Sequence, residues 1–115
     1  MRRFEGRLSI VTGASQGIGE AIARDLAGEG ATVVLVDVQL DKLEAVARSI
    51  AADGGKAEVH QVDVADTAAV ERVVGAVAAA YGRIDHLVNN AGITRDGLLM
   101  RMREEDWDAV LRVNL

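Results

Sequence analysis

The fold is indicated most clearly by residues 12–19, which read Thr12-Gly13-Ala14-Ser15-Gln16-Gly17-Ile18-Gly19. This stretch follows the apolar run Leu8-Ser9-Ile10-Val11 and leads into a helical pattern from Ile18 to Leu26. Glycines let a backbone turn tightly and approach a phosphate closely. The free N–H groups and the dipole of the following helix then favour the charge of the anion. A turn that serves strand–helix packing alone is the competing interpretation, but the flanking strand and helix favour a phosphate or dinucleotide site.

Outward from this stretch, the chain repeats a strand followed by a helix. Strands are expected over residues 8–12, 32–36, 57–62 and 85–90, and apolar residues at helical spacing follow each of them, at 18–26, 40–50, 70–81 and 104–115. In the first helix Ile18, Ile22 and Leu26 share one stripe. Alternation of β and α segments predicts a parallel sheet with right-handed crossovers. The polar alternation at 57–62 indicates a half-exposed strand near the sheet edge.

Composition narrows the functional classes. The chain has 115 residues, half of them hydrophobic, which suits one globular domain. The net charge of -5 and the lack of a basic cluster beyond Arg2-Arg3 argue against binding nucleic acid or a membrane surface. There is no cysteine, no run long enough to span a bilayer, and no signal-peptide pattern in Met1-Arg2-Arg3-Phe4-Glu5, so a cytoplasmic location is expected.

Proline is absent, although natural chains of this size usually contain several. Chance in a helix-rich segment is one explanation. An engineered or reconstructed sequence is the other, and composition leaves both open.

Acidic side chains follow two of the expected strands. Asp37 ends the second strand, 18 positions after Gly19, where a carboxylate accepts hydrogen bonds from the ribose of a dinucleotide and repels a 2′-phosphate. Gln16 also favours a cofactor without the 2′-phosphate, because with a neutral residue there the loop holds no basic side chain to bind that phosphate. These residues predict NAD rather than NADP. Asp63, at the end of the third strand, is either an adenine contact or a local cap, and both interpretations stand.

Polar residues near the fourth strand and the last helix are further candidates. Asn89 and Asn90 end the fourth strand. The alternative interpretation is structural, because asparagine side chains hydrogen-bond to the backbone within turns. Asn114 lies on the apolar stripe of the last helix. His60 and His86 have no second ligand at metal spacing, so no metal site is expected.

Together these motifs resemble those of the short-chain dehydrogenase/reductase family. Residues 12–19 match its TGxxxGxG loop, Asn89-Asn90-Ala91-Gly92 its NNAG motif, and Asp63-Val64 its adenine-contact pair. Val113-Asn114-Leu115 resembles the segment that carries its catalytic asparagine. Residues 90–102 are similar to the bacterial 3-oxoacyl-[acyl-carrier-protein] reductases, a subfamily that usually uses NADPH, from which Asp37 departs.

The resemblance implies half of a Rossmann doubly wound fold, with four parallel strands in the order 3-2-1-4. It implies cofactor contacts at Gly13, Ser15, Gln16, Gly17, Ile18, Gly19, Asp37, Asp63, Val64, Asn90, Ala91 and Gly92. Of the family's catalytic tetrad only Asn114 has a match. The family's tyrosine and lysine have YxxxK spacing, whereas the position four after Tyr81, the one tyrosine here, is Asp85.

We therefore expect residues 1–115 to form one truncated dinucleotide-binding domain, the N-terminal cofactor-binding half of such an enzyme. It should bind nucleotide weakly and transfer no hydride alone. The alternative is a structural half-fold without activity, which homodimerises through the edge of the fourth strand or by exchanging its last helix. A rearranged, flavodoxin-like domain with the last helix folded over the sheet is a third arrangement.

Overall fold

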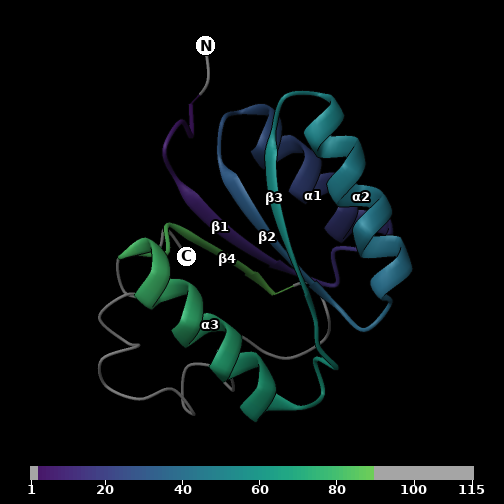
Figure 1. Ribbon diagram of the computed structural model, residues 1–115, viewed down its shortest axis with the longest axis vertical. Coiled ribbons are helices and arrows are strands. Elements are labelled where there is room, and N and C mark those ends of the chain that lie inside the picture. The colour runs from purple at the N-terminus through teal and green to yellow at the C-terminus, as the bar shows by residue number, and fades with distance from the viewer. Residues whose placement is uncertain (1–2, 90–115) are drawn as a thin grey trace.

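The computed structural model describes residues 3–89 of the chain. These residues form a four-stranded parallel sheet with helices on both faces (Figure 1). The strands are β1 (Leu8–Thr12), β2 (Thr32–Asp37), β3 (Lys56–Gln61) and β4 (His86–Asn89), and the helices are α1 (Gly17–Gly28), α2 (Leu40–Ala52) and α3 (Thr67–Tyr81). The strand order is β3-β2-β1-β4, and every pair is parallel. The order expected from the sequence is confirmed.

Strand β1 lies inside the sheet and all five of its residues are buried. Because successive side chains of a strand point to opposite faces, β1 contributes to two apolar cores. Leu8 and Ile10 pack in one core with residues of α3, and Val11 packs in the other with residues of α1 and α2. Figure 1 shows the same division, with α1 and α2 on one face and α3 on the other.

The helices bury most of the apolar positions predicted in α2 and α3, although Tyr81 at the end of α3 is 44% exposed, and in α1 Ile22 and Leu26 are partly buried against the core. Leu43, Val46 and Ile50 of α2 are buried, as are three valines of α3. In α1 the buried residues are Gly19, Ala23 and Ala27, while Ile18 is 71% exposed. The expectation that Ile18 faces the core is therefore wrong. The small residues let α1 approach the sheet closely, and this places Ile18 outside, at the start of the helix.

Strand β3 is shifted by one residue from the expected 57–62, and it lies at the sheet edge as predicted. The pairing with β2 continues beyond the strand, because the Val62 amide donates to the Asp37 carbonyl at 2.9 Å. The next helix begins after Asp66, its N-cap, whose side-chain oxygen accepts from the Ala69 amide at 3.1 Å.

Asp85 fixes the amino ends of β1 and β4. Its carboxylate accepts from the Leu8 amide at 2.7 Å, and it pairs with Arg7 at 3.2 Å and with Arg83 at 3.1 Å. Burial raises the pKa of Asp85, but these hydrogen bonds and guanidinium charges outweigh it, so the pKa lies below its ordinary value. The sequence places Asp85 within the fourth strand, whereas the strand begins one residue later.

The predicted features beyond residue 89, including the helix at 104–115, lie outside the described residues. Within residues 3–89, no helix combines the length and the apolar character that crossing a membrane requires.

The turn after α1 yields a test of the fold. Gly30 has a φ of +99°, and a Cβ there would lie 3.0 Å from the backbone N and Cα of Glu5. Gly30→Ala should therefore lower the free energy of unfolding by about 1–3 kcal/mol, measured by urea denaturation. Gly28→Ala is the matched control, because a Cβ at Gly28 meets nothing within 4 Å. Equal stability of the two variants would contradict this account.

Candidate functional site

The loop from β1 to α1 lies at the carboxyl edge of the sheet. Two of its glycines, Gly13 and Gly17, have φ values of 65° and 61°, a conformation that other residues rarely adopt. The Gly13 amide donates to the Val36 carbonyl at 2.8 Å, which extends the β1–β2 pairing into the loop. The turn is thus held by the neighbouring strand as well as by its own glycines.

The N-terminus of α1 faces out of this loop. Its N-cap, Gln16, has an extended backbone with φ −163° and ψ 170°, and its side chain does not cap the helix. The first N–H groups of an α-helix have no acceptor within the helix. Those of Gly17 and Ile18 therefore offer hydrogen bonds, together with the positive end of the helix dipole, to an anion such as a phosphate.

Asp37 connects the end of β2 to this loop. Its Oδ2 accepts from the Ser15 hydroxyl at 2.7 Å and from the Ser15 amide at 3.3 Å. Its Oδ1 accepts from the amides of Val38 at 2.6 Å and Gln39 at 3.3 Å. Burial raises the pKa of Asp37, but the hydrogen bonds, led by that of the Ser15 hydroxyl, outweigh it and lower the pKa. Asp37 is therefore ionised at neutral pH, at the position expected of the ribose-binding carboxylate.

Asp63 and Val64 lie beyond the end of β3, at the same edge. The exposed Asp63 accepts from the Ala65 amide at 2.9 Å, which is the local cap considered for it from the sequence. Val64 is partly buried against the core under α3. The adenine contact stays a prediction for both residues.

A basic residue that the sequence motifs did not reveal reaches the loop. Lys42, in the first turns of α2, donates from Nζ to Oε1 of Gln16 at 2.8 Å. The two residues are 26 positions apart, so only the chain fold brings them together. A hollow of ≈ 430 Å³ adjoins this contact and is lined by Gln39, Leu40, Asp41, Lys42 and Gln61.

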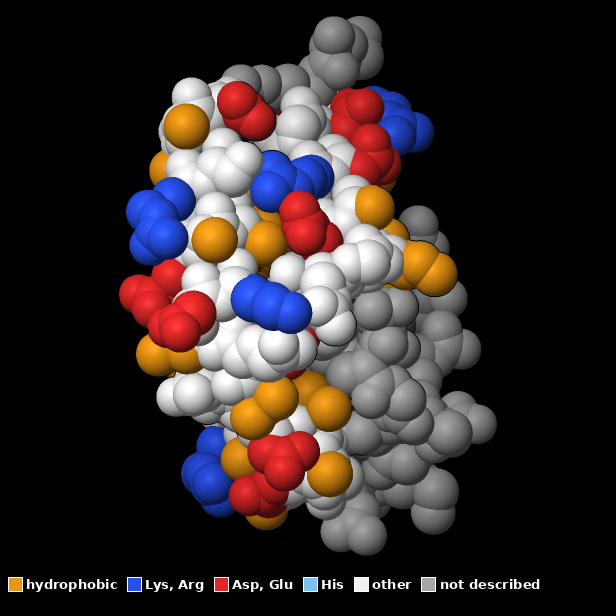
Figure 2. Space-filling model, turned by 90° about the vertical axis from the view of Figure 1, so that its right-hand side faces the viewer, with side chains coloured by type: hydrophobic (Ala, Val, Ile, Leu, Met, Phe, Trp, Pro, Cys, Tyr) orange, Lys and Arg blue, Asp and Glu red, His pale blue; other side chains and the backbone are white. Residues whose placement is uncertain are grey.

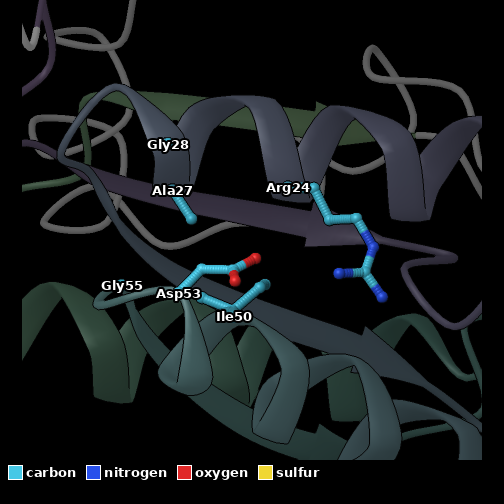
Figure 3. Close-up of a pocket in the computed structure, with 6 residues that line it drawn as sticks. All are labelled: Arg24, Ala27, Gly28, Ile50, Asp53 and Gly55. Atoms are coloured by element: carbon cyan, nitrogen blue, oxygen red, sulfur yellow. The ribbon is translucent and has the colours of Figure 1, made fainter.

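A second pocket lies at the other end of α1 and α2, away from the loop. It has a volume of ≈ 90 Å³, and Figure 3 shows Ala27 and Ile50 reaching into it from the two helices, near the carboxylate of Asp53. Pockets that bind small molecules usually have volumes of about 300–1,000 Å³. This pocket is too small for a nucleotide.

The outer face of α1 and α2 carries acidic and basic side chains interspersed with each other (Figure 2). Among residues 3–89, no group of three His, Asp or Glu side chains is placed to hold a metal ion. The candidates Asn90, Ala91, Gly92 and Asn114 lie outside the described residues, and their cofactor and catalytic roles stay predictions.

Comparison with known proteins assigns the family. The family model for short chain dehydrogenases matches residues 7–115. The chain belongs to the short-chain dehydrogenase family. A 3-oxoacyl-[acyl-carrier-protein] reductase FabG of Thermotoga maritima is 48% identical over 113 residues, which are 98% of this chain and 46% of the relative. A 2,3-dihydro-2,3-dihydroxybenzoate dehydrogenase of Bacillus subtilis is 44% identical over 111 residues, 96% of this chain and 42% of the relative.

Solved structures of similar proteins have the same fold. A metagenomic short-chain oxidoreductase in complex with NADP matches with a TM-score of 0.74 and 48% identity, over 97% of this chain and 51% of that chain. L-sorbose reductase from Gluconobacter frateurii, complexed with NADPH and L-sorbose, matches with a TM-score of 0.73 and 38% identity, over 96% and 43%. The chain thus spans about half the length of these proteins and of its curated relatives.

The Ser15–Asp37 contact predicts a change in acid stability. Ser15→Ala removes the strongest donor to the carboxylate and should raise the pKa of Asp37, measured by carbon-13 NMR of the carboxyl group. A depressed pKa stabilises the folded chain above the unfolded value, near 3.8, and this contribution is lost as the pH falls through the folded pKa. As the pH falls through this range, the free energy of unfolding of Ser15→Ala should therefore decrease less than that of the wild type.

Ser49→Ala is the matched control, because Ser49 accepts from Arg24 between α1 and α2 and does not contact Asp37. If the pKa of Asp37 is the same in the wild type and in Ser15→Ala, the Ser15 hydroxyl is not the donor that lowers it.

Proposed function

We propose that this chain binds the adenosine side of a nicotinamide dinucleotide, weakly, and with NAD preferred over NADP. The observation that carries the proposal is the convergence of the α1 N-terminus and the ionised Asp37 on one glycine-rich loop. The loop amides would hold the pyrophosphate, and Asp37 would accept from the ribose hydroxyls. The domain proposed for this role is residues 1–115, with the predicted contacts at Asp63, Val64 and residues 90–92 completing it.

Family membership supports cofactor binding, and the relatives leave the substrate open. Proteins more than 40% identical to this chain are named for different substrates, a 3-oxoacyl-carrier protein in one case and a dihydroxybenzoate derivative in another. One similar oxidoreductase was solved in complex with NADP, the cofactor that carries the 2′-phosphate. The preference for NAD therefore rests on Asp37 of this chain.

Calorimetric titration of the purified chain with NAD, ADP-ribose and AMP tests binding. We expect dissociation constants near the millimolar range for all three, with NAD bound more tightly than NADP. Asp37→Asn should move the NAD-to-NADP affinity ratio about five- to tenfold toward NADP, because it removes a negative charge from beside the 2′ position.

Asp53→Asn is the matched control for this charge change, since Asp53 caps the C-terminus of α2 near the opposite edge of the sheet. The absence of heat at millimolar ligand would reject the binding proposal.

Hydride transfer is not expected from the chain alone. Tyr81 ends α3 near the amino edge of the sheet, where its hydroxyl donates to Glu58 at 3.1 Å. Burial and this carboxylate raise the pKa of Tyr81, so it is a poor proton donor to a carbonyl, and it lies at the edge opposite the loop. In the same preparation, NADH and NADPH should not be oxidised when a 3-oxoacyl thioester is added.

A structural role with homodimerisation is the second candidate. In residues 3–89, β4 ends the strand order and pairs with β1 alone. A strand edge with free backbone groups can pair with a second chain. Light scattering at high protein concentration should then give the mass of a dimer, whereas a monomer would contradict this candidate. The cytoplasmic location expected from the sequence stays a prediction.

A further inference from the structure

The charges beside the glycine-rich loop do not all repel a phosphate. Asp37 hydrogen-bonds to Ser15, and Lys42 hydrogen-bonds to Gln16, the next residue of the loop. An anionic and a cationic side chain thus contact consecutive residues at the position proposed for the adenosine ribose.

All the hydrogen bonds that the Asp37 carboxylate accepts from the described residues come from neutral donors. Each carboxylate oxygen accepts two hydrogen bonds, which fills the roughly four acceptor positions of the group. No ion pair joins Asp37 to a basic side chain within the described part of the chain. Asp37 therefore does not neutralise Lys42.

The ammonium of Lys42 has only a neutral partner among residues 3–89. It donates to the side-chain amide of Gln16, and no described carboxylate forms an ion pair with it. An ammonium carries three donors, so two are available to a ligand. The exposed hollow of ≈ 430 Å³ beside it provides space, although Asp41 also lines this hollow and opposes an anion there.

We propose that Lys42 is a specificity-determining residue that binds the 2′-phosphate of an NADP-type cofactor. This deepens the proposed function and rests on it. The phosphate would take the place of the Gln16 amide as the partner of Lys42, and this attraction would offset part of the repulsion from Asp37. The preference for NAD is then narrow, and the site accepts both dinucleotides.

Two small probes isolate the 2′-phosphate. 5′-AMP and adenosine 2′,5′-bisphosphate differ in that group alone, and calorimetry on the 115-residue chain gives the dissociation constant of each. Lys42→Met should weaken binding of the bisphosphate about two- to fivefold, the range of one exposed ion pair, and leave 5′-AMP within about twofold. Lys42→Arg should retain bisphosphate binding, and the loss in Lys42→Met should shrink as salt is added.

Lys56→Met is the matched control, because Lys56 is the other lysine of the chain and opens β3 at the opposite edge of the sheet. It should change neither constant. If wild type binds 5′-AMP but Lys42→Met keeps the wild-type ratio of the two constants, the role of Lys42 is overturned while the proposed function stands. If wild type binds neither probe, both proposals fail.

Discussion

The hydrogen bond from the Ser15 hydroxyl to the Asp37 carboxylate is the contact on which the site depends. Strands β1 and β2 pair in parallel, with Thr12 opposite Val36, so the turns that follow them leave the sheet side by side. The buried β1 fixes this arrangement from within the sheet. Asp37 then joins the two turns, and its hydrogen bonds to Ser15 hold the loop in the conformation proposed to bind the pyrophosphate.

This preorganisation has a consequence for affinity. A ribose that binds Asp37 must exchange its hydroxyl hydrogen bonds for some that the protein already makes. The 3.3 Å bonds from the amides of Ser15 and Gln39 are longer than those from the Ser15 hydroxyl and Val38, so they are the easier ones to exchange. Because bonds are exchanged rather than added, the net gain is modest. Weak binding is thus expected from the described residues themselves.

The sequence predicts the strands and the position of the loop, because these follow from apolar periodicity and a glycine pattern that are local in the chain. The strand order is not local, and it is predicted only through the resemblance to the family. The sequence does not predict that Gly19 and Ala23 are buried in α1 while Ile18 is exposed, because the small residues pack against the sheet through their size rather than their hydrophobicity. It also does not predict contacts between residues that are distant in the chain. Lys42 meets Gln16, and Asp85 meets Leu8, only after the sheet has formed.

Amide chemical-shift mapping with ADP-ribose would locate the nucleotide on the chain. In a nitrogen-15 labelled chain, the account predicts the largest shifts at Gly13, Gly17 and Ile18 of the loop, with further shifts at Val38 and Gln39, whose amides donate to Asp37. Residues around the pocket between the C-terminal ends of α1 and α2 should not shift. Shifts centred on that pocket, or no shifts at millimolar ligand, would contradict the account.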